Sequence, residues 1–211
     1  ESERRRKIPV HSLYGNSVES LVPTDEALSS IDLMLIDLQD IGSRYYTYVW
    51  TAVLCAKSCS RKGRKVILCD RPNPIGGISV EGGEIEPGFE SFVGLHSVPN
   101  RHGMTLAEIV HYVNDNDQLG ANIDIIRMGG WQRHMLWDNT VLSWRNPSPN
   151  MRSLEAALLY PGMCLIEATN LSEGRGTDEP FILVGAPFLS ADEISSKFNA
   201  LSLPGIFAEP E

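Results

Sequence analysis

Short apolar segments alternate along the chain with longer stretches whose apolar residues recur at helical spacing. The short segments are rich in Val, Ile or Leu and are bounded by turn residues, the pattern of strands covered on both faces. They span Ile8–Leu13, Asp32–Leu38, Lys65–Cys69, Asn122–Arg127 and Met163–Ala168. This alternation predicts a doubly wound, three-layer α/β domain, with helices on both faces of a mostly parallel sheet of about five strands.

The longer stretches begin at residues that commonly cap helices. Thr24 precedes two acidic residues, Thr105 has Glu108 three positions further on, and Ser190 precedes Ala-Asp-Glu. A Ser or Thr at a helix start accepts a hydrogen bond from a free backbone N–H, and a Glu three residues later completes a capping box. The sequence therefore predicts helices over Pro23–Ser30, Arg44–Ser60, Thr105–Leu119, Met151–Tyr160 and Ser190–Leu201.

Two long loops interrupt this alternation, the larger of them rich in Gly and Pro. They span Asp70–Gly103 and Asn170–Pro180. Loops of this length without secondary structure are uncommon and usually functional, and ligands of doubly wound sheets bind beyond the carboxyl ends of the strands. Four polar clusters fall there, and we expect them to line one concavity: Gln39–Asp40 with Arg44, Asp70–Asn73, Arg101–His102 and Glu167–Arg175.

Composition excludes several classes of protein. Hydrophobic residues make up 42% of the chain and charged residues 21%, as in globular domains, and no apolar run approaches the roughly 18 residues of a membrane span. An excess of 27 acidic over 18 basic residues argues against a nucleic-acid surface, and the basic run 4–7 is interpreted as a solvated end. The four cysteines show no zinc-type spacing, and no dinucleotide fingerprint, Walker loop or serine elbow is present.

Carboxylates are the remaining candidates for chemistry. Two of them flanking a glycosidic bond can serve as acid and base, or as acid and nucleophile. Those at predicted strand ends or in the long loops are Asp40, Asp70, Glu81, Glu84, Glu167 and Glu173. The alternative is that they cap helices or pair with the arginines of the same loops, Arg44, Arg71, Arg101 and Arg175.

Amide, imidazole and aromatic side chains also leave two interpretations open. Asn73, Asn150 and Asn170 suit recognition of sugar hydroxyls, but Asn often occupies turns for backbone reasons alone. His102 is a candidate general acid or base, or simply a residue at a helix start. The aromatic residues could form a stacking wall or belong to the core: Tyr45, Tyr46, Tyr48, Trp131, Trp137 and Trp144.

Several long motifs occur in a fixed order between about Pro9 and Pro204. They are Asp37–Tyr48 (DLQDIGSRYYTY), Asp70–Gly77 (DRPNPIGG), Glu81–Gly82, Gly88–Gly94 (GFESFVG), Arg101–Thr105 (RHGMT), Pro147–Met151 (PSPNM), Tyr160–Gly162 (YPG) and Glu167–Thr177 (EATNLSEGRGT). In these motifs the chain resembles the NamZ-like exo-β-N-acetylmuramidases, a family once catalogued as a domain of unknown function.

The resemblance implies a peptidoglycan glycosidase that releases N-acetylmuramic acid from non-reducing glycan ends and needs no cofactor or metal. It implies a Rossmann-like larger domain, a smaller C-terminal domain and a cleft between them. Among the carboxylates present in the chain, we expect Glu167, Glu173 and Asp70 to be the catalytic residues. The substrate-binding candidates are Asp40, Arg44, Arg71, Asn73, Glu81, Arg101, His102, Asn150, Asn170 and Arg175, the arginines being suited to the lactyl carboxylate of the sugar. The substrate class suggests an extracytoplasmic or periplasmic location.

The chain also departs from the family pattern. A Ser-Pro-Glu-His-Gly motif, whose Glu is a leading catalytic candidate in the family, does not occur. We therefore expect residues 1–211 to form a single Rossmann-like domain that lacks the family's first unit and its C-terminal domain, and that can associate with itself through uncovered surface. The alternative to an enzyme is a non-catalytic sugar-binding or interaction fragment. A small-molecule enzyme such as a transferase is disfavoured by the absence of a phosphate-binding loop.

Overall fold

The structure is a computed structural model that describes residues 8–15 and 18–211. The chain divides into two compact units, one ending at Ser143 and the other running from Trp144 to Glu211. The basic run at residues 4–7 lies outside the described residues. Among the described residues, no helix is long and apolar enough to cross a membrane.

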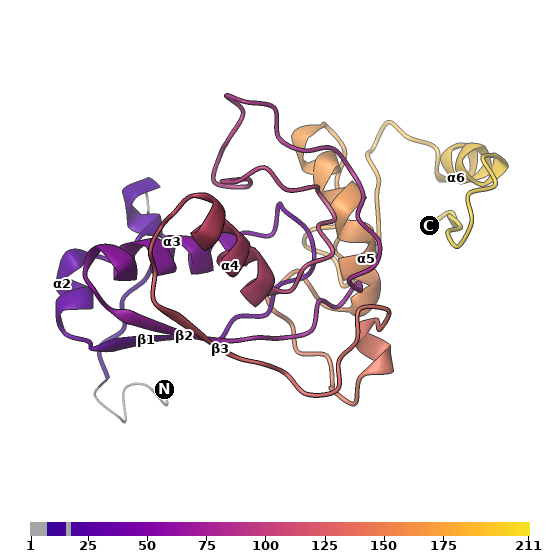
Figure 1. Cartoon of the computed structure of the whole chain (residues 1–211). Helices are drawn as coiled ribbons and strands as arrows, with labels where there is room; N and C mark the ends of the chain where they lie inside the picture. Colours follow the sequence, from indigo (N-terminus) through magenta and orange to yellow (C-terminus); the bar gives the residue numbers. More distant parts are fainter. Residues whose placement is uncertain (1–7, 16–17) are drawn as a thin grey trace. The chain divides into compact units, whose positions relative to one another are not determined.

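A parallel sheet of three strands organises the first unit (Figure 1). The strands β1 (Leu33–Ile36), β2 (Lys65–Cys69) and β3 (Ile123–Ile126) lie in the order β1-β2-β3, with β2 in the centre. The helices α3 (Tyr48–Arg61) and α4 (Leu106–Asn116) connect them, as parallel strands require. The predicted parallel α/β fold is confirmed.

The core of this unit lies between the sheet and the helices α3 and α4, which share one side of it (Figure 1). Val66 and Leu68 of β2 point to this side and are fully buried, together with Trp50 of α3 and Ile109 of α4. Burial of each such side chain contributes about 1.5–3 kcal/mol relative to exposure, so this interface holds the strand ends in place.

The opposite face of the sheet is largely open. Leu33, Leu35 and Ile126 point to it because side chains alternate along a strand, and Leu35 remains 59% exposed. Among the described residues, the expectation of helices on both faces is therefore met on one face only.

Two of the five predicted strands are wrong. The segment Ile8–Leu13 forms no strand, and its Ile8 and Val10 side chains are exposed. The segment predicted over Met163–Ala168 is the end of α5 (Leu154–Met163) followed by the 3-10 helix η3 (Cys164–Ala168). A short apolar run suits a packed helical segment as well as a strand, and periodicity cannot separate the two.

The capping signals predicted the helix starts well. Thr24 accepts a hydrogen bond at the start of α2 (Asp25–Ser29), and Thr105 and Glu108 form the capping box of α4. Ser190 caps α6 (Ala191–Ala200) of the second unit. The other short elements are the 3-10 helices η1 (Val18–Leu21) and η2 (Trp137–Asn139).

Candidate functional site

Three of the predicted polar clusters meet in the first unit, beyond the carboxyl ends of β1 and β2. Asp40 follows β1, Asp70 and Asn73 follow β2, and His102 precedes α4. Asp40 contacts His102, and Asp70 and Asn73 both hydrogen-bond the segment 104–107. These three segments contact one another because the carboxyl ends of parallel strands meet at one edge of the sheet.

The Asp40 carboxylate and the His102 imidazole form a buried pair. Oδ2 of Asp40 lies 3.3 Å from Nε2 of His102 and accepts a 2.8 Å hydrogen bond from the N–H of Gly42. Nδ1 of His102 accepts from the N–H of Met104 at 3.2 Å, which assigns the ring proton to Nε2; this atom lies near the carboxylate but makes no hydrogen bond within the described residues. Both side chains are buried, so we interpret this contact as one that holds the loop after β1 against the segment before α4.

Asp70 and Asn73 are occupied by the backbone around α4. Asp70 accepts from the Thr105 hydroxyl at 3.0 Å and from the N–H of Ala107 at 3.1 Å. Burial raises the pKa of Asp70 and outweighs these hydrogen bonds, which act in the other direction. Asn73 donates to the carbonyl of Met104 and accepts from the N–H of Ile75. Both contacts match the capping and turn interpretations that the sequence left open.

Three of the four arginines bind groups of neighbouring segments, and one of them, Arg44, also lines a pocket. Arg44 is buried and donates to the carbonyls of Gly83, at 2.8 Å, and Val98. Arg71 grips Asp37 with two hydrogen bonds of 2.6 and 3.0 Å, which raise the pKa of Arg71. Arg101 donates to Glu81 and to the carbonyl of Ile75, both at 2.6 Å.

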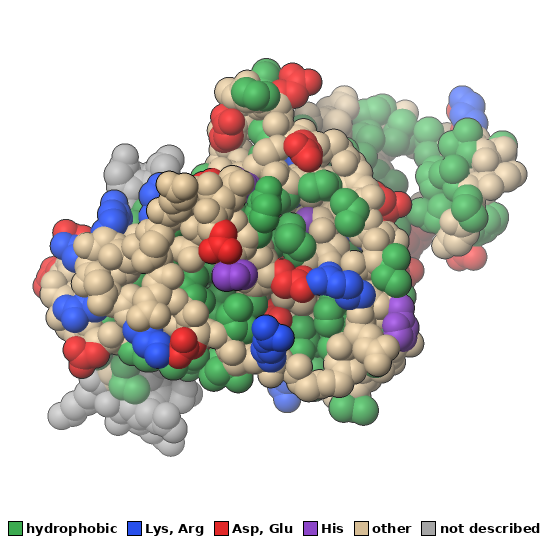
Figure 2. Space-filling view, viewed as in Figure 1, with side chains coloured by type: hydrophobic (Ala, Val, Ile, Leu, Met, Phe, Trp, Pro, Cys, Tyr) green, Lys and Arg blue, Asp and Glu red, His purple; other side chains and the backbone are tan. Residues whose placement is uncertain are grey.

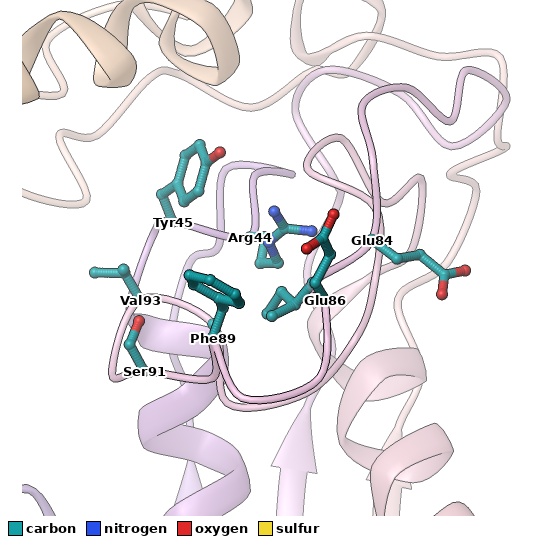
Figure 3. Close-up of a pocket in the computed structure, with 9 residues that line it drawn as sticks. Arg44, Tyr45, Glu84, Glu86, Phe89, Ser91 and Val93 are labelled. Carbon is teal, nitrogen blue, oxygen red and sulfur yellow. The ribbon is translucent and has the colours of Figure 1, made fainter.

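A pocket of about 370 Å³ opens where Arg44 and Tyr45 meet the loop between β2 and α4 (Figure 3). Phe89, exposed over 73% of its surface, forms one wall, and Glu86 lies beside it. The loop projects from the unit, and its tip carries hydrophobic and acidic side chains next to one another (Figure 2). Phe89 and Glu86 were not among the predicted site residues, although both lie in the long loop that was expected to be functional.

The aromatic residues divide between core and pocket. Tyr46 and Trp137 are buried, as the core interpretation holds, and Trp144 donates to the carbonyl of Met151 in the second unit. Tyr45 alone of the six lines the pocket described above.

Arg175 joins two carboxylates in the second unit. Its Nη2 lies 2.8 Å from Oε2 of Glu167, and its Nε lies 2.8 Å from Oε1 of Glu173. The guanidinium carbon lies 5.3 Å from the centre of the Phe181 ring. Burial lowers the pKa of Arg175, but the hydrogen bonds and charges of the two glutamates outweigh it, so the pKa is raised. This cluster brings together three of the predicted site residues.

The two remaining asparagines lie in turns of the second unit. Asn150 is half-buried in the turn before Met151, and Asn170 is exposed between η3 and Ser172. Each unit thus holds its own polar cluster. That the two clusters face one concavity, and that residues 1–211 form one domain, remain predictions.

Comparison with known proteins gives two family matches. Residues 1–155 match the family model described as "Exo-beta-N-acetylmuramidase NamZ, N-terminal", and residues 158–211 match the C-terminal model of the same name. The C-terminal part therefore begins inside this chain, whereas we expected the smaller domain to begin beyond Glu211. The chain is 41% identical over 204 residues to the peptidoglycan beta-N-acetylmuramidase NamZ of Bacillus subtilis (strain 168), covering 97% of this chain and 49% of that protein.

Two solved structures from Bacteroides fragilis, both of DUF1343 family proteins, share the fold. One has a TM-score of 0.85 and 34% identity over 92% of this chain and 50% of the other. The second has a TM-score of 0.70 and 33% identity over 78% of this chain and 46% of the other. The chain spans about half the length of the relatives that it matches.

Proposed function

The chain belongs to the exo-β-N-acetylmuramidase NamZ family, and on that premise we propose that it is part of a glycoside hydrolase. The reaction is release of N-acetylmuramic acid from the non-reducing ends of peptidoglycan fragments. The observation that carries the proposal is the 41% identity to a peptidoglycan β-N-acetylmuramidase along 97% of this chain. An α/β fold alone would not suggest this reaction, since such folds host many chemistries.

Glu167 and Glu173 are the proposed catalytic carboxylates. Glycoside hydrolysis needs two carboxyl groups in different surroundings, one to protonate the leaving oxygen and one to act as base or nucleophile. The side chain of Glu173 is 10% exposed and that of Glu167 is 37% exposed, although both contact one guanidinium. This difference supports distinct roles for the two residues.

Asp70 has weaker support as a third catalytic residue. Its two oxygens already accept hydrogen bonds from Thr105 and Ala107 at the start of α4. We propose that Asp70 acts as a positioning residue that fixes the start of α4. The same reasoning gives Asp40, Asn73 and Arg44 a supporting role, because all three are buried.

The test is hydrolysis of a chromogenic β-N-acetylmuramide by the purified chain. Because the chain spans about half of its relatives, we expect little or no release by residues 1–211 alone and release by a longer protein that also carries the parts present in the relatives. In that longer protein, Glu167→Gln and Glu173→Gln should lower turnover by about 100-fold or more if each residue is an acid, base or nucleophile. Glu155→Gln, an exposed position in α5, is the matched control and should retain the parent rate. Parent turnover by both site variants would contradict the assignment. Sugar binding without any release by the longer protein would favour the non-catalytic alternative.

A further inference from the structure

The four arginines predicted to meet a substrate carboxylate differ in how they are held. A guanidinium can bind a ligand carboxylate when three conditions hold. The guanidinium is accessible to solvent, some of its N–H groups are bound to a fixed partner, and its other N–H groups are bound only to a partner that the ligand can displace. Arg44 is buried on backbone carbonyls, and Arg101 is 22% exposed and tied to Glu81 and Ile75. Each is held by at least one backbone carbonyl, a group that cannot move away to admit a ligand.

Arg71 is accessible but lacks an anchor of this kind. The same carboxylate, that of Asp37, takes both its Nε and its Nη2, and the Asp37 side chain is itself 46% exposed. A ligand that displaced Asp37 would therefore remove both of the hydrogen bonds that orient this guanidinium.

Arg175 combines an anchored edge with an exchangeable one. On the buried side, Nε donates to Glu173 and the guanidinium lies over the Phe181 ring. Phe181 is itself buried and packs edge-on against Tyr160, with ring centres 4.8 Å apart. These contacts hold the plane of the guanidinium without help from Glu167.

The outer edge of Arg175 carries only a weak contact. Nη2 donates to Oε2 of Glu167, and the two side chains are 47% and 37% exposed. Exposed ion pairs of this kind contribute about 0–1 kcal/mol, because water and salt screen them. A ligand carboxylate can therefore take the place of Glu167 at little cost.

We propose that Arg175 is the binding site for the carboxylate of an acidic sugar, and that Glu167 occupies this site only while no sugar is bound. The proposal rests on the proposed function, which supplies a sugar whose lactyl ether ends in a carboxylate. Binding transfers Nη2 from Glu167 to the sugar, while Nε stays on Glu173. The displaced Glu167 carboxylate is then free to contact the sugar that displaced it.

The test compares binding of N-acetylmuramic acid with that of N-acetylglucosamine, which lacks the lactyl carboxylate, by titration calorimetry or NMR. Arg175→Lys keeps the charge but loses the planar fork, so affinity for N-acetylmuramic acid should fall about tenfold or more. Glu167→Gln removes the competing charge, so the affinity should rise several-fold. For each variant the change in affinity for N-acetylglucosamine should be much smaller than the change for N-acetylmuramic acid.

Arg152 and Asp178 provide the matched control in the same unit. They form an exposed ion pair of 2.9 Å, comparable to that between Arg175 and Glu167. Arg152→Lys and Asp178→Asn should bind both sugars as the parent does. If Arg175→Lys fails to fold, because Glu173 loses its partner, Glu167→Gln decides: a rise in affinity supports the proposal, and an unchanged or lower affinity overturns it.

The outcomes separate this inference from the function on which it rests. If the parent binds N-acetylmuramic acid better than N-acetylglucosamine but Arg175→Lys and Glu167→Gln match the parent, the inference is wrong and the proposed function stands. If the parent neither prefers N-acetylmuramic acid nor hydrolyses its glycosides, the proposed function fails and the inference falls with it.

Discussion

Nε2 of His102 lies 3.3 Å from Oδ2 of Asp40, and the two side chains are 0% and 4% exposed. Asp40 lies in the loop after β1 and His102 lies in the segment before α4, so the contact joins two segments at the same edge of the sheet. Because the pair is out of reach of water, loss of either partner leaves a buried polar group without its counterpart.

Replacement of His102 tests this contact. His102→Ala should lower the free energy of unfolding by about 2 kcal/mol or more, because removal of the fully buried imidazole leaves a cavity beside the buried Asp40 carboxylate. Asp40→Asn should cost less, since its amide oxygen can still accept from the N–H of Gly42. Urea denaturation at pH 7 measures both. His111→Ala, in an exposed pair with Asp115, is the control and should change stability by less than about 0.5 kcal/mol. Equal losses for His102 and His111 would contradict the buried-pair account.

Gly42 should not tolerate a side chain. It has a φ of +85°, and a Cβ there would lie 2.6 Å from Cγ1 of Ile75 and closer still to Oδ1 of Asn73. Gly42→Ala should therefore cost about 2 kcal/mol or more, from backbone strain together with overpacking. Gly63→Ala is the matched control: its φ is +61°, but a Cβ meets nothing within 4 Å. It should lose only about 1 kcal/mol, from the left-handed backbone alone. Chemical denaturation would show whether the first cost exceeds the second.

Asp70 gives a prediction that depends on pH. Because burial raises the pKa of Asp70 in the folded state, its contribution to stability is full below the pKa of the unfolded chain and is lost as pH rises through the raised value. Asp70→Asn keeps an acceptor for the N–H of Ala107 and cannot ionise. Its stability relative to the parent should therefore increase between pH 4 and pH 7. Asp70→Ala loses the acceptor and should be less stable than Asp70→Asn by about 1 kcal/mol. A stability difference between Asp70→Asn and the parent that does not change with pH would exclude this account.

The open face of the sheet predicts self-association. Leu33 and Leu35 of β1 and Ile126 of β3 expose apolar side chains on this face, on either side of the central strand β2, and such surfaces favour contact with another molecule. Leu35→Glu places a charge on this face and should shift the chain toward the monomer in sedimentation velocity at micromolar concentration. Val141→Glu, at a fully exposed position outside the sheet, should leave the distribution unchanged. A monomeric parent would show that this face does not mediate association.

The parts of the fold that were predictable depend on local signals. The bounds of β2 were predicted to the residue, because Gly63 and Asp70 punctuate an apolar run on both sides. The capping box of Thr105 and Glu108 is equally local. The strand predicted over Met163–Ala168 was wrong, because α5 continues through Pro161–Gly162 and is followed directly by η3. No local sequence pattern indicates this continuation.

The candidate site was predictable at the level of motifs but not of partners. The motif 167–177 contains both the glutamates and the arginine that contact one another, so its cluster could be anticipated. Asp70 and Asn73 were ambiguous, because the backbone groups that occupy them belong to Ala107 and Met104, far along the chain. The pocket beside Phe89 depends on the three-dimensional path of a loop, and sequence periodicity carries no information about that path.

The Arg44 side chain closes the base of that loop by binding the carbonyls of Gly83 and Val98. The end of the loop is also held, because Leu95 packs against the core and His96 lies 3.5 Å from Asp117. Lengthening a loop whose two ends are held costs little, about 0.6 kcal/mol for each doubling of its length. Residues 84–91, which include Glu86 and Phe89 of the pocket wall, can therefore vary in sequence and length with little effect on the sheet.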